Sequence, residues 1–562
     1  MTMSLAPRRR FRAPTEDCAA LFDPPLAEVP ALIAANQALG REFDSRAGFP
    51  SGFRQEARGL AVMLAPTSPP RGAALANVDS PVILSGHQPE LFHPGVWLKN
   101  FVLSAIAERA QGIALNLVID NDVVHATSIR VPTAVASGWP QVVEVPFDAP
   151  GERIPWARRS ILDPAAFITF RSAVRRAGEG LLGAAGTADG LLLDRMWPHA
   201  LAAQATQRAN FERLIRQQKL GQLPDGNVSR FINLGQCLAT ARHQLEREIG
   251  LQTAEHLLSW VADHHFLTFA AHLLARHREL HAIHNDVLAD YRLQNGIRNA
   301  AQPVPDLARE GDWYEVPLWV WSWADPKAPR RRAFVRQVGK SWELSDLAGL
   351  TIPDWSRAEN PPLELMQHQM QVLPRALITT MYARLVLSDL FIHGIGGAKY
   401  DEVTDEIIRR FFGLEPPRYL TATATFRLPI ERPQVAIEDL RDNSERLRNV
   451  RYRPESFVGD PLLAGEPALE NELAALAAEK RDYLARHKPR RRPREVFAGL
   501  DAINRAMHER LAPVEEHLRR EQARLAEEWK TARVLGSREF SFVLFPEDYL
   551  VPRLLELARL PA

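Results

Sequence analysis

Short apolar runs followed by turn-forming residues recur in the first third of the chain. Pro81–Leu84 is apolar and contains β-branched residues, turn formers follow it, and apolar residues then recur at helical spacing from Val96 to Ile106. This order predicts a strand, a loop and a helix. The next apolar run, Ala114–Ile119, lacks alternation, which is typical of a strand buried on both faces of a parallel sheet. Together the segments predict a β-α-β unit with a right-handed crossover.

Beyond this unit the hydrophobic pattern changes along the chain. A helix is predicted around Leu26–Leu39, before the unit, and residues 191–293 predict a predominantly helical insertion. Another apolar helix is predicted at Leu373–Leu390. Runs rich in aromatic and β-branched residues predict strands at four places: residues 141–146, 312–323, 333–338 and 538–545.

From Val435 to about Thr531, charged residues alternate with Leu and Ala in long helical stretches. Spacings of three and four residues, sustained over this length, predict an antiparallel coiled-coil arm. The basic segment Lys488–Arg494 divides two of its helical runs. We interpret this segment as a solvated loop at the tip of a helical hairpin, with a nucleic-acid patch as the weaker alternative.

These patterns give an α/β fold with a Rossmann-like, doubly wound parallel core. Residues 1–80 form an N-terminal lead-in that is partly disordered, and residues 81–434 form the core with its helical insertion at about 191–293. The coiled-coil arm spans 435–533, and residues 534–562 return to the core.

Composition narrows the class of protein. The chain has 562 residues, enough for two or three domains, and its 69 basic and 68 acidic residues leave a formal charge of +1. No overall field therefore attracts nucleic acid or a membrane surface. Its two cysteines, Cys18 and Cys237, support neither a disulfide framework nor a cysteine-based metal site, which fits a reducing cytoplasm.

Neither a membrane span nor a secretory signal is expected. No run of about 18 apolar residues occurs. The start, Met1–Pro14, carries several arginines without an apolar stretch behind them, so we interpret it as a disordered basic tail.

The loop between the first predicted strand and helix contains two histidines, His87 and His93. In a doubly wound sheet, ligands lie at the carboxyl ends of the strands, and phosphates favour the start of the following helix. His93-Pro-Gly95 resembles the first three positions of the His-x-Gly-His signature of nucleotidylyltransferases and class I aminoacyl-tRNA synthetases, with Val96 at the fourth position. His87 would supply the second imidazole. The alternative is a loop whose histidines bond backbone carbonyls.

The second predicted strand ends in a polar cluster, Asp120, Asn121 and Asp122. The crossover places this cluster at the same sheet edge as the histidines. Its acids would hold Mg²⁺ accompanying ATP, or accept hydrogen bonds from a ribose or an amine substrate. The alternative is Asx-turn chemistry that ends a strand.

A second glycine-rich loop lies within Phe391–Glu402. Gly394, Gly396 and Gly397 free the backbone to approach a ligand, and Lys399 is placed to meet an anion, with Tyr400 beside it. The spacing is not that of a Walker A loop. The alternative is a flexible turn between helices.

Two further groups of residues are weaker candidates. Trp319, Trp321 and Trp323 would share one face of a strand, followed by Arg330–Arg332. They would form a wall of a substrate pocket with an arginine meeting a carboxylate, or pack in the core. Seven histidines between residues 256 and 284 do not form a His-Glu-x-x-His motif, so we interpret them as surface and capping residues and predict no protein metal site.

Taken together, these residues resemble the cysteine-adding enzymes of bacillithiol biosynthesis. That family's Gly-Gln-Gln-x-x-Leu loop is similar to Gly86-His-Gln-Pro-Glu-Leu91, which includes Gln88, and its acidic cluster is similar to Asp120–Asp122. Its later Gly-x-Gly-x-x-x-Tyr loop matches Gly394, Gly396 and Tyr400. The sequence departs from the family where His87 replaces Gln and where His93-Pro-Gly95 replaces Thr-Gly-Pro.

The resemblance implies a cytoplasmic ligase with a Rossmann-like core and a homodimer formed through the coiled coil. We expect it to join cysteine or another amine-bearing small molecule to a sugar-linked or carboxylate acceptor, with ATP or ADP and Mg²⁺ as cofactors. Catalytic roles are expected for His87, His93 and Lys399, which would neutralise phosphate charge. The nucleotide-binding residues are expected to be Gly86, Gln88, Gly95, Gly394, Gly396, Gly397 and Tyr400, and the substrate-binding residues Asp120, Asn121, Asp122, Trp319 and Trp321.

Two alternatives to the ligase remain. One is a nucleotidylyltransferase-type enzyme that stops at the activated intermediate. The other is a non-catalytic, nucleotide-sensing scaffold whose coiled coil recruits a partner.

Overall fold

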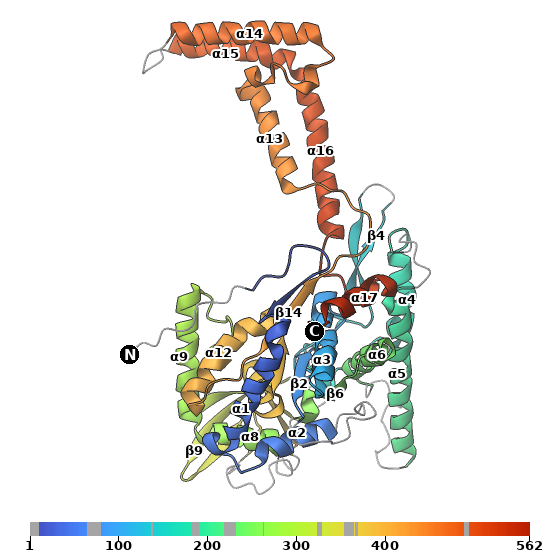
Figure 1. Cartoon of the computed structure of the whole chain (residues 1–562), viewed down its shortest axis with the longest axis vertical. Helices are drawn as coiled ribbons and strands as arrows, with labels where there is room; N and C mark the ends of the chain where they lie inside the picture. The colour runs from blue at the N-terminus through green and yellow to red at the C-terminus, as the bar shows by residue number, and fades with distance from the viewer. Residues whose placement is uncertain are drawn as a thin grey trace.

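The computed structural model describes residues 11–63, 80–135, 139–182, 190–217, 232–261, 264–322, 329–352, 365, 369–487 and 494–561. The protein is a mixed α/β body with a helical arm that projects from it (Figure 1). Most of the predicted basic tail, Trp323 and most of the basic segment between the arm's helical runs lie outside the described residues.

A six-stranded sheet forms the centre of the body, in the order β1-β14-β13-β2-β3-β6. Its strands are β1 (Ala19–Asp23), β2 (Val82–His87), β3 (Ile113–Val118), β6 (Ala254–Leu257), β13 (Leu390–His393) and β14 (Leu420–Thr425). β1 is antiparallel to β14, and the other five strands are parallel to one another. Numbered along the chain, the parallel strands lie in the order 3-2-1-4-5, so the direction of winding reverses between β2 and β13.

Both faces of this sheet are buried, as the unbroken apolar strands require. Ile83 of β2 packs into one core, while Val82 and Leu84 pack into the other. The first core includes residues of α3 (Pro94–Arg109), α4 (Pro164–Ala177), α5 (Leu192–Arg216), α6 (Leu234–Ile249) and α17 (Glu547–Leu557). The second includes residues of α2 (Phe53–Met63), α7 (Leu258–Val261), α8 (His264–Ala275), α9 (His277–Asn295), α11 (Ala376–Tyr382) and α12 (Ile395–Phe412). The helix α1 (Val29–Ala47) contributes to both cores.

A second, antiparallel sheet is inserted between α9 and α11. Its strands are β7 (Arg309–Glu310), β8 (Trp313–Ser322), β9 (Arg331–Val338), β10 (Ser341–Ser345), β11 (Thr351–Ile352) and β12 (Met370–Pro374). The main path runs β11-β10-β9-β8-β12. A separate hairpin joins β4 (Ser128–Thr133) to β5 (Gln141–Pro146).

In the residues that the structure describes, the arm contains four α-helices: α13 (Ile437–Tyr452), α14 (Pro467–Arg486), α15 (Arg494–Arg510) and α16 (Ala512–Leu535). α13 and α16 lie side by side and carry α14 and α15 across their far end (Figure 1). Leu473, Met507 and Leu518 belong to a small core of the arm. The predicted helical character is confirmed, but the apolar seam is divided among helices that change direction near Leu511.

Short 3-10 and π turns complete the fold: η1 (Leu26–Glu28), η2 (Trp156–Arg158), η5 (Ala383–Leu387), η6 (Pro454–Phe457), η7 (Pro461–Leu463) and η8 (Phe542–Leu544). Of the helices in the described residues, none has the length and apolarity to cross a membrane.

Three predicted elements were wrong. Residues 254–257, predicted as helix, form the core strand β6, because its polar residues Glu255 and His256 are buried by neighbouring elements. Leu373–Leu390 is not one helix: α11 and η5 occupy its middle, and β13 begins at Leu390. The predicted strand at 538–545 contains η8, where the backbone N–H of Phe542 donates to the carbonyl of Phe92 and places aromatic residues in the first core.

Candidate functional site

The predicted loop with two histidines connects β2 to α3 at the carboxyl edge of the parallel sheet. His87 is the last residue of β2, and His93 is the N-cap of α3, where its Nδ1 accepts a hydrogen bond of 3.1 Å from the Gly95 N–H. A neutral His93 therefore carries its proton on Nε2. The Nδ1 of His87 lies 3.3 Å from the Gln88 carbonyl, which can only accept, so a neutral His87 carries its proton on Nδ1 and a lone pair on Nε2.

A buried lysine that the sequence analysis did not select lies beside this loop. Lys99, in the second turn of α3, donates a hydrogen bond of 2.8 Å from Nζ to the Gly86 carbonyl. Burial, together with the nearby Arg242 guanidinium, lowers the pKa of Lys99 to about 7. A lysine with this pKa exchanges its proton near neutral pH.

The two imidazoles are kept neutral by their surroundings. Burial and the Lys99 charge lower the pKa of His87 to about 3. Burial lowers the pKa of His93 to about 4, with Glu539 opposing the shift and Arg538 and Lys99 adding to it. The surroundings of the β2–α3 loop and the start of α3 therefore disfavour the protonated forms of His87, His93 and Lys99.

One arginine and one exposed carboxylate complete the charged groups described around His93. Arg538 reaches the same end of the sheet and donates to Thr425 Oγ1 at 3.3 Å and to Thr423 Oγ1 at 3.4 Å on β14. The carboxylate of Glu539 lies 3.9 Å from His93 Nε2, and its side chain is 57% exposed. An anion placed here would meet the Nε2–H donor of His93, the protonated form of Lys99 and the N-terminus of α3, a helix of 16 residues.

The glycines of this loop permit close packing of backbone on backbone. A Cβ on Gly95 would lie 2.1 Å from the Ala424 carbonyl oxygen of β14, and a Cβ on Gly86 would lie 2.7 Å from the Leu117 carbonyl oxygen of β3. Packing of α3 and β2 against their neighbours therefore requires glycine at both positions.

The loop after β3 meets the loop after β2, as predicted from the crossover. Gln88 Nε2 donates a hydrogen bond of 3.0 Å to Asp122 Oδ2, and Arg330 forms an ion pair of 3.0 Å with Asp122 Oδ1. Asn121 donates from Nδ2 to the Pro374 carbonyl at 2.6 Å, which ties this loop to β12 of the second sheet. Gln88, Asp122 and Arg330 thus come together at the carboxyl edge.

Asp120 is turned toward β6 and not toward Gln88. Its Oδ1 accepts a hydrogen bond of 2.8 Å from the Ser259 N–H, and its Oδ2 accepts from the Ser259 hydroxyl. Burial raises the pKa of Asp120 to about 6, although both of these bonds act to lower it. These bonds hold the turn that follows β6.

The two described tryptophans of β8 differ in their surroundings. Trp321 is 1% exposed and fills space in the fold. Trp319 is contacted by two arginines, with guanidinium carbons 4.3 Å (Arg330) and 4.7 Å (Arg375) from its ring centroid. Arg330 therefore links Trp319 to Asp122, while Arg375 also pairs with Glu315 at 2.6 Å.

The second predicted loop lies between β13 and α12. Gly394 is the N-cap of α12, and a Cβ on Gly394 or Gly396 would have nothing within 4 Å, whereas one on Gly397 would lie 2.5 Å from His393 Nδ1. Lys399 and Tyr400 are exposed, and the Lys399 carbonyl accepts a hydrogen bond of 3.2 Å from Tyr291 of α9.

Lys399 and the two histidines belong to different faces of the sheet. α12 contributes to the second core, whereas α3, which begins at His93, contributes to the first. Lys99 is the lysine that the fold brings to His87 and His93. The sequence feature that could have revealed the burial of Lys99 is its position within a helix that is largely apolar on all sides.

A second buried charge network, also not predicted, surrounds His393 at the end of β13. His393 Nε2 lies 2.5 Å from Asp401 Oδ2, and Arg384 donates to the same oxygen at 2.8 Å and to Asp405 Oδ1 at 2.6 Å. Burial acts to raise the pKa of Asp401, but His393 and Arg384 hold it well below its usual range. This network fixes α12 to β13 and the π turn before it.

No protein-family model matches the chain, and no curated protein matches its sequence.

Proposed function

We propose that this protein is a ligase-type enzyme that binds an anionic group, such as a nucleotide phosphate, between the β2–α3 loop and the start of α3. It would join cysteine or another amine-bearing small molecule to a sugar-linked or carboxylate acceptor, as the cysteine-adding enzymes of bacillithiol biosynthesis do. The strand order 3-2-1-4-5 supports a Rossmann-like, doubly wound core, in which ligands bind where the order reverses. Here that point lies between β2 and β13.

The observation that carries the proposal is the buried Lys99 beside two neutral imidazoles. A buried ammonium without a carboxylate partner is costly, and its cost falls when an anion arrives. Burial lowers the pKa of Lys99, and the nearby Arg242, another cation, lowers it further. A phosphate or carboxylate ligand would supply the missing negative charge.

The tautomers of the two histidines suggest different roles in such a reaction. His93 has an N–H at Nε2 that can donate to a phosphate oxygen, together with the Lys99 ammonium. His87 has a lone pair at Nε2 that can accept a hydrogen bond from an attacking amine and orient it. In this proposal Lys99 takes the phosphate-binding role that the sequence had suggested for Lys399.

The acceptor would lie toward the second sheet. Arg330 is held against Trp319 and Asp122, and its guanidinium has the geometry to pair with a carboxylate-bearing ligand.

Asp120 and Asp122, the two acids predicted to hold Mg²⁺, do not fit such a site. The two oxygens of Asp120 accept from Ser259, and those of Asp122 accept from Gln88, Val123 and Arg330. A cation would have to displace these bonds, so we assign no step to Mg²⁺.

The test is calorimetric titration with ATP and with ADP, each with and without Mg²⁺. We expect Lys99→Met and His93→Asn to weaken binding at least tenfold, while the exposed Lys399→Met leaves it unchanged. Because anion binding favours the protonated Lys99, affinity should rise as pH falls from 8.5 to 6.5. Equal loss in Lys399→Met and Lys99→Met, or no binding by the unmodified protein, would overturn this site.

Product analysis separates the ligase from its alternatives. The protein is incubated with ATP, cysteine and sugar-linked or carboxylate acceptors, and the products are identified by mass spectrometry. A condensed product whose mass is the sum of both substrates less water identifies the ligase. An adenylylated or otherwise nucleotidyl-linked substrate identifies a nucleotidylyltransferase, and nucleotide binding without any product favours the scaffold.

We also propose that the arm is a coiled-coil dimerisation element. Tyr452 and Phe497, both on the arm, have side chains that are 63% and 58% exposed, and large apolar groups of this kind favour burial in a partner.

A further inference from the structure

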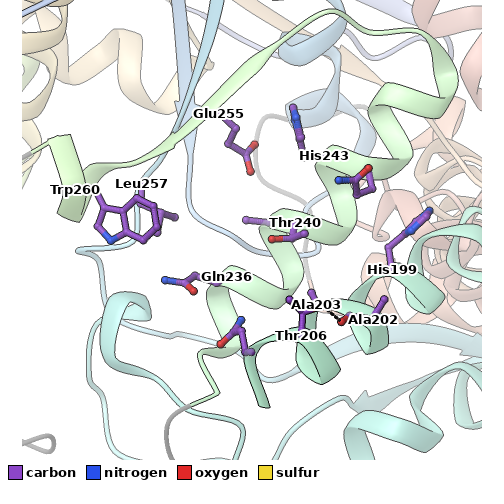
Figure 2. A pocket seen from close by; sticks show the side chains of 13 residues that line it. His199, Ala202, Ala203, Thr206, Gln236, Thr240, His243, Glu255, Leu257 and Trp260 are labelled. Carbon is purple, nitrogen blue, oxygen red and sulfur yellow. Dashed lines mark hydrogen bonds between the residues drawn. The ribbon is translucent and has the colours of Figure 1, made fainter. Parts of the chain in front are cut away.

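A cavity of about 460 Å³ lies beside the edge strand β6 (Figure 2). Side chains of α5, α6 and the β6 segment converge on it from three sides. Its volume is within the range of small-molecule binding sites. None of the residues that the sequence analysis selected lines it.

One side chain in this cavity is buried without a hydrogen-bond partner. His243 of α6 is 1% exposed, and neither Nδ1 nor Nε2 has a partner among the described residues. Leaving a buried polar group unpaired costs about 1–3 kcal/mol. Because His243 lines the cavity, a ligand within it can supply the missing hydrogen bond.

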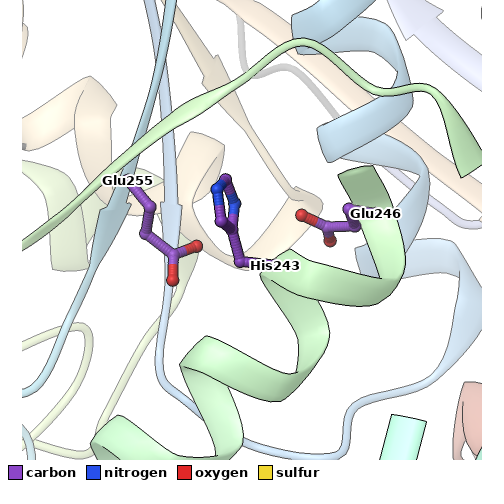
Figure 3. A group of neighbouring side chains, drawn as sticks. All are labelled: His243, Glu246 and Glu255. Atoms are coloured by element: carbon purple, nitrogen blue, oxygen red, sulfur yellow. The ribbon is translucent and has the colours of Figure 1, made fainter. Parts of the chain in front are cut away.

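The inner wall beside His243 carries net negative charge. Figure 3 shows the His243 ring between the carboxylates of Glu246 and Glu255, and the ligand atoms of the three residues lie within 4.8 Å of one another. Arg242 donates to both Glu246 oxygens at 2.9 Å and also pairs with Glu255. Among these side chains alone, two carboxylates and one guanidinium leave one negative charge.

The lining residues themselves favour a cation with an apolar body. They include one acidic residue, Glu255, and neither lysine nor arginine. His199, at the α5 side, lies 2.9 Å from the exposed carboxylate of Glu248. Ala203, Leu257 and Trp260 provide apolar surface, and Trp260 is 51% exposed.

A metal ion fits this wall less well. Glu246 already accepts from Trp97 Nε1 at 2.8 Å and Asn100 Nδ2 at 2.6 Å, in addition to Arg242. A divalent cation would need the same carboxylate oxygens and would lie against the guanidinium of Arg242.

We propose that the cavity binds a small protonated amine with an apolar body. Its ammonium group would donate to His243 and be stabilised by Glu255, and its body would lie against Ala203, Leu257 and Trp260. The residues that line this cavity do not include those of the proposed ligase site, and the proposal does not depend on the ligase activity.

The experiment compares three probes of nearly equal size: 2-phenylethylamine, 2-phenylethanol and phenylacetate. Calorimetric titration of the full chain at pH 7.5 should show binding of the amine, at least tenfold weaker binding of the alcohol, and none of phenylacetate. Binding of phenylacetate, or equal binding of the amine and the alcohol, would overturn the proposal.

Variants locate the binding. Thr206 is exposed and lines the cavity, so Thr206→Trp should block the amine, whereas Ala205→Trp adds the same bulk to the adjacent, exposed, non-lining position and should leave binding unchanged. His243→Phe should weaken the amine at least tenfold. Thermal unfolding of each variant checks the fold, and the probe series on the unmodified protein stands even if His243→Phe does not fold.

Two outcomes would contradict this location. The first is unchanged amine affinity in Thr206→Trp. The second is binding of Zn²⁺, titrated alone, that competes with the amine and is lost in His243→Phe, which would replace the amine site by a metal site.

Discussion

Burial gives Lys99 a chemistry that an exposed lysine does not have. Its Nζ is held by the Gly86 carbonyl, and its pKa of about 7 allows it to act near neutral pH either as an ammonium or as an amine. His87 and His93 stay neutral over the same range. One edge of the sheet therefore offers a proton acceptor, a proton donor and a titratable cation.

The cost of burying Lys99 predicts a pH-dependent gain in stability for Lys99→Met. Below pH 7 the lysine is protonated in both states, and the folded state bears the full cost, roughly 2–5 kcal/mol. Between pH 7 and pH 10.5 the unfolded chain binds a proton that the folded protein does not, so the free energy of unfolding rises with pH. Urea unfolding at pH 6.5 and pH 9.5 should show the variant more stable than the unmodified protein at pH 6.5 and the difference much reduced at pH 9.5. A difference that does not change with pH would contradict the assigned pKa.

Glu246 should be far more important for stability than its neighbour Glu248. Glu246 is fully buried and accepts from Arg242, Trp97 and Asn100, so Glu246→Gln leaves Arg242 with one carboxylate fewer in the interior. The expected loss is about 3–5 kcal/mol. Glu248 is 41% exposed, and Glu248→Gln should cost less than about 1 kcal/mol. Chemical denaturation of both variants tests this, and similar losses would show that the buried network is not what holds α6 to α3.

At the carboxyl edge of the parallel sheet, the candidate residues in loops could be predicted from the sequence, and those in buried helices could not. His87, His93 and Asp122 follow strands, where the topology alone predicts a shared edge, and the Gln88–Asp122 bond joins these loops. Lys99 lies inside α3, and a helical lysine is ordinarily exposed. Only packing on every side of α3 makes it a buried cation. The unpaired His243 was hidden for the same reason, because it lies beside Glu255 of β6, which sequence reasoning assigned to a helix.

At the scale of elements, the contact between α3 and β14 sets how close the β2–α3 loop lies to the sheet. In Gly95→Ala the new Cβ would lie 2.1 Å from the Ala424 carbonyl, so α3 must shift, at an expected cost of at least about 3 kcal/mol. Gly394→Ala is the matched control, since its φ is −82° and its Cβ meets nothing within 4 Å. Its effect on thermal stability should stay within about 1 kcal/mol. Equal effects would mean that α3 can move away from β14 without cost.

Gly394→Ala also tests the predicted nucleotide contact at the β13–α12 loop. If a nucleotide lies against this backbone, the variant should retain its stability and bind ATP more weakly in calorimetric titration. Unchanged ATP affinity would leave the β2–α3 loop as the sole nucleotide contact among the described parts of the two loops.

Elements with a strong hydrophobic period were predicted from the sequence, and those defined by distant partners were not. The strand, loop and helix at β2 and α3 and the strands β3, β5, β8 and β9 agree with their patterns. β6 was missed because Glu255 and His256 are polar residues that the structure buries through Arg242, Asn116 and neighbouring side chains. η8 was predicted as a strand because aromatic residues favour both strands and cores, and its lack of strand partners is a tertiary property.

At the scale of the whole molecule, the arm projects from the body (Figure 1). It carries exposed apolar side chains. If it forms a dimer, Phe497→Lys should shift the protein from dimer to monomer in sedimentation velocity and leave its far-UV circular dichroism unchanged, because Phe497 is 58% exposed in one chain. Leu555→Lys, on α17 of the body and 42% exposed, is the control and should leave the dimer intact. A monomer in the unmodified protein, or dissociation by both variants alike, would remove the arm as the dimer contact.

The order in which the central strands are joined has a consequence for synthesis of the protein. β2 pairs with β13 through Ile83 and Leu390, and a hydrogen bond from Val82 to Asp389 closes a sequence separation of 307 residues. While a ribosome translates the intervening chain, β2 has β3 on one side and an open, apolar edge on the other. Such an edge is a template for pairing with other chains. The pairing of β2 with β13 is also slow, because the two strands are far apart in the sequence. Fragments that end before residue 390 should therefore aggregate more readily than the full chain, which light scattering after refolding would show.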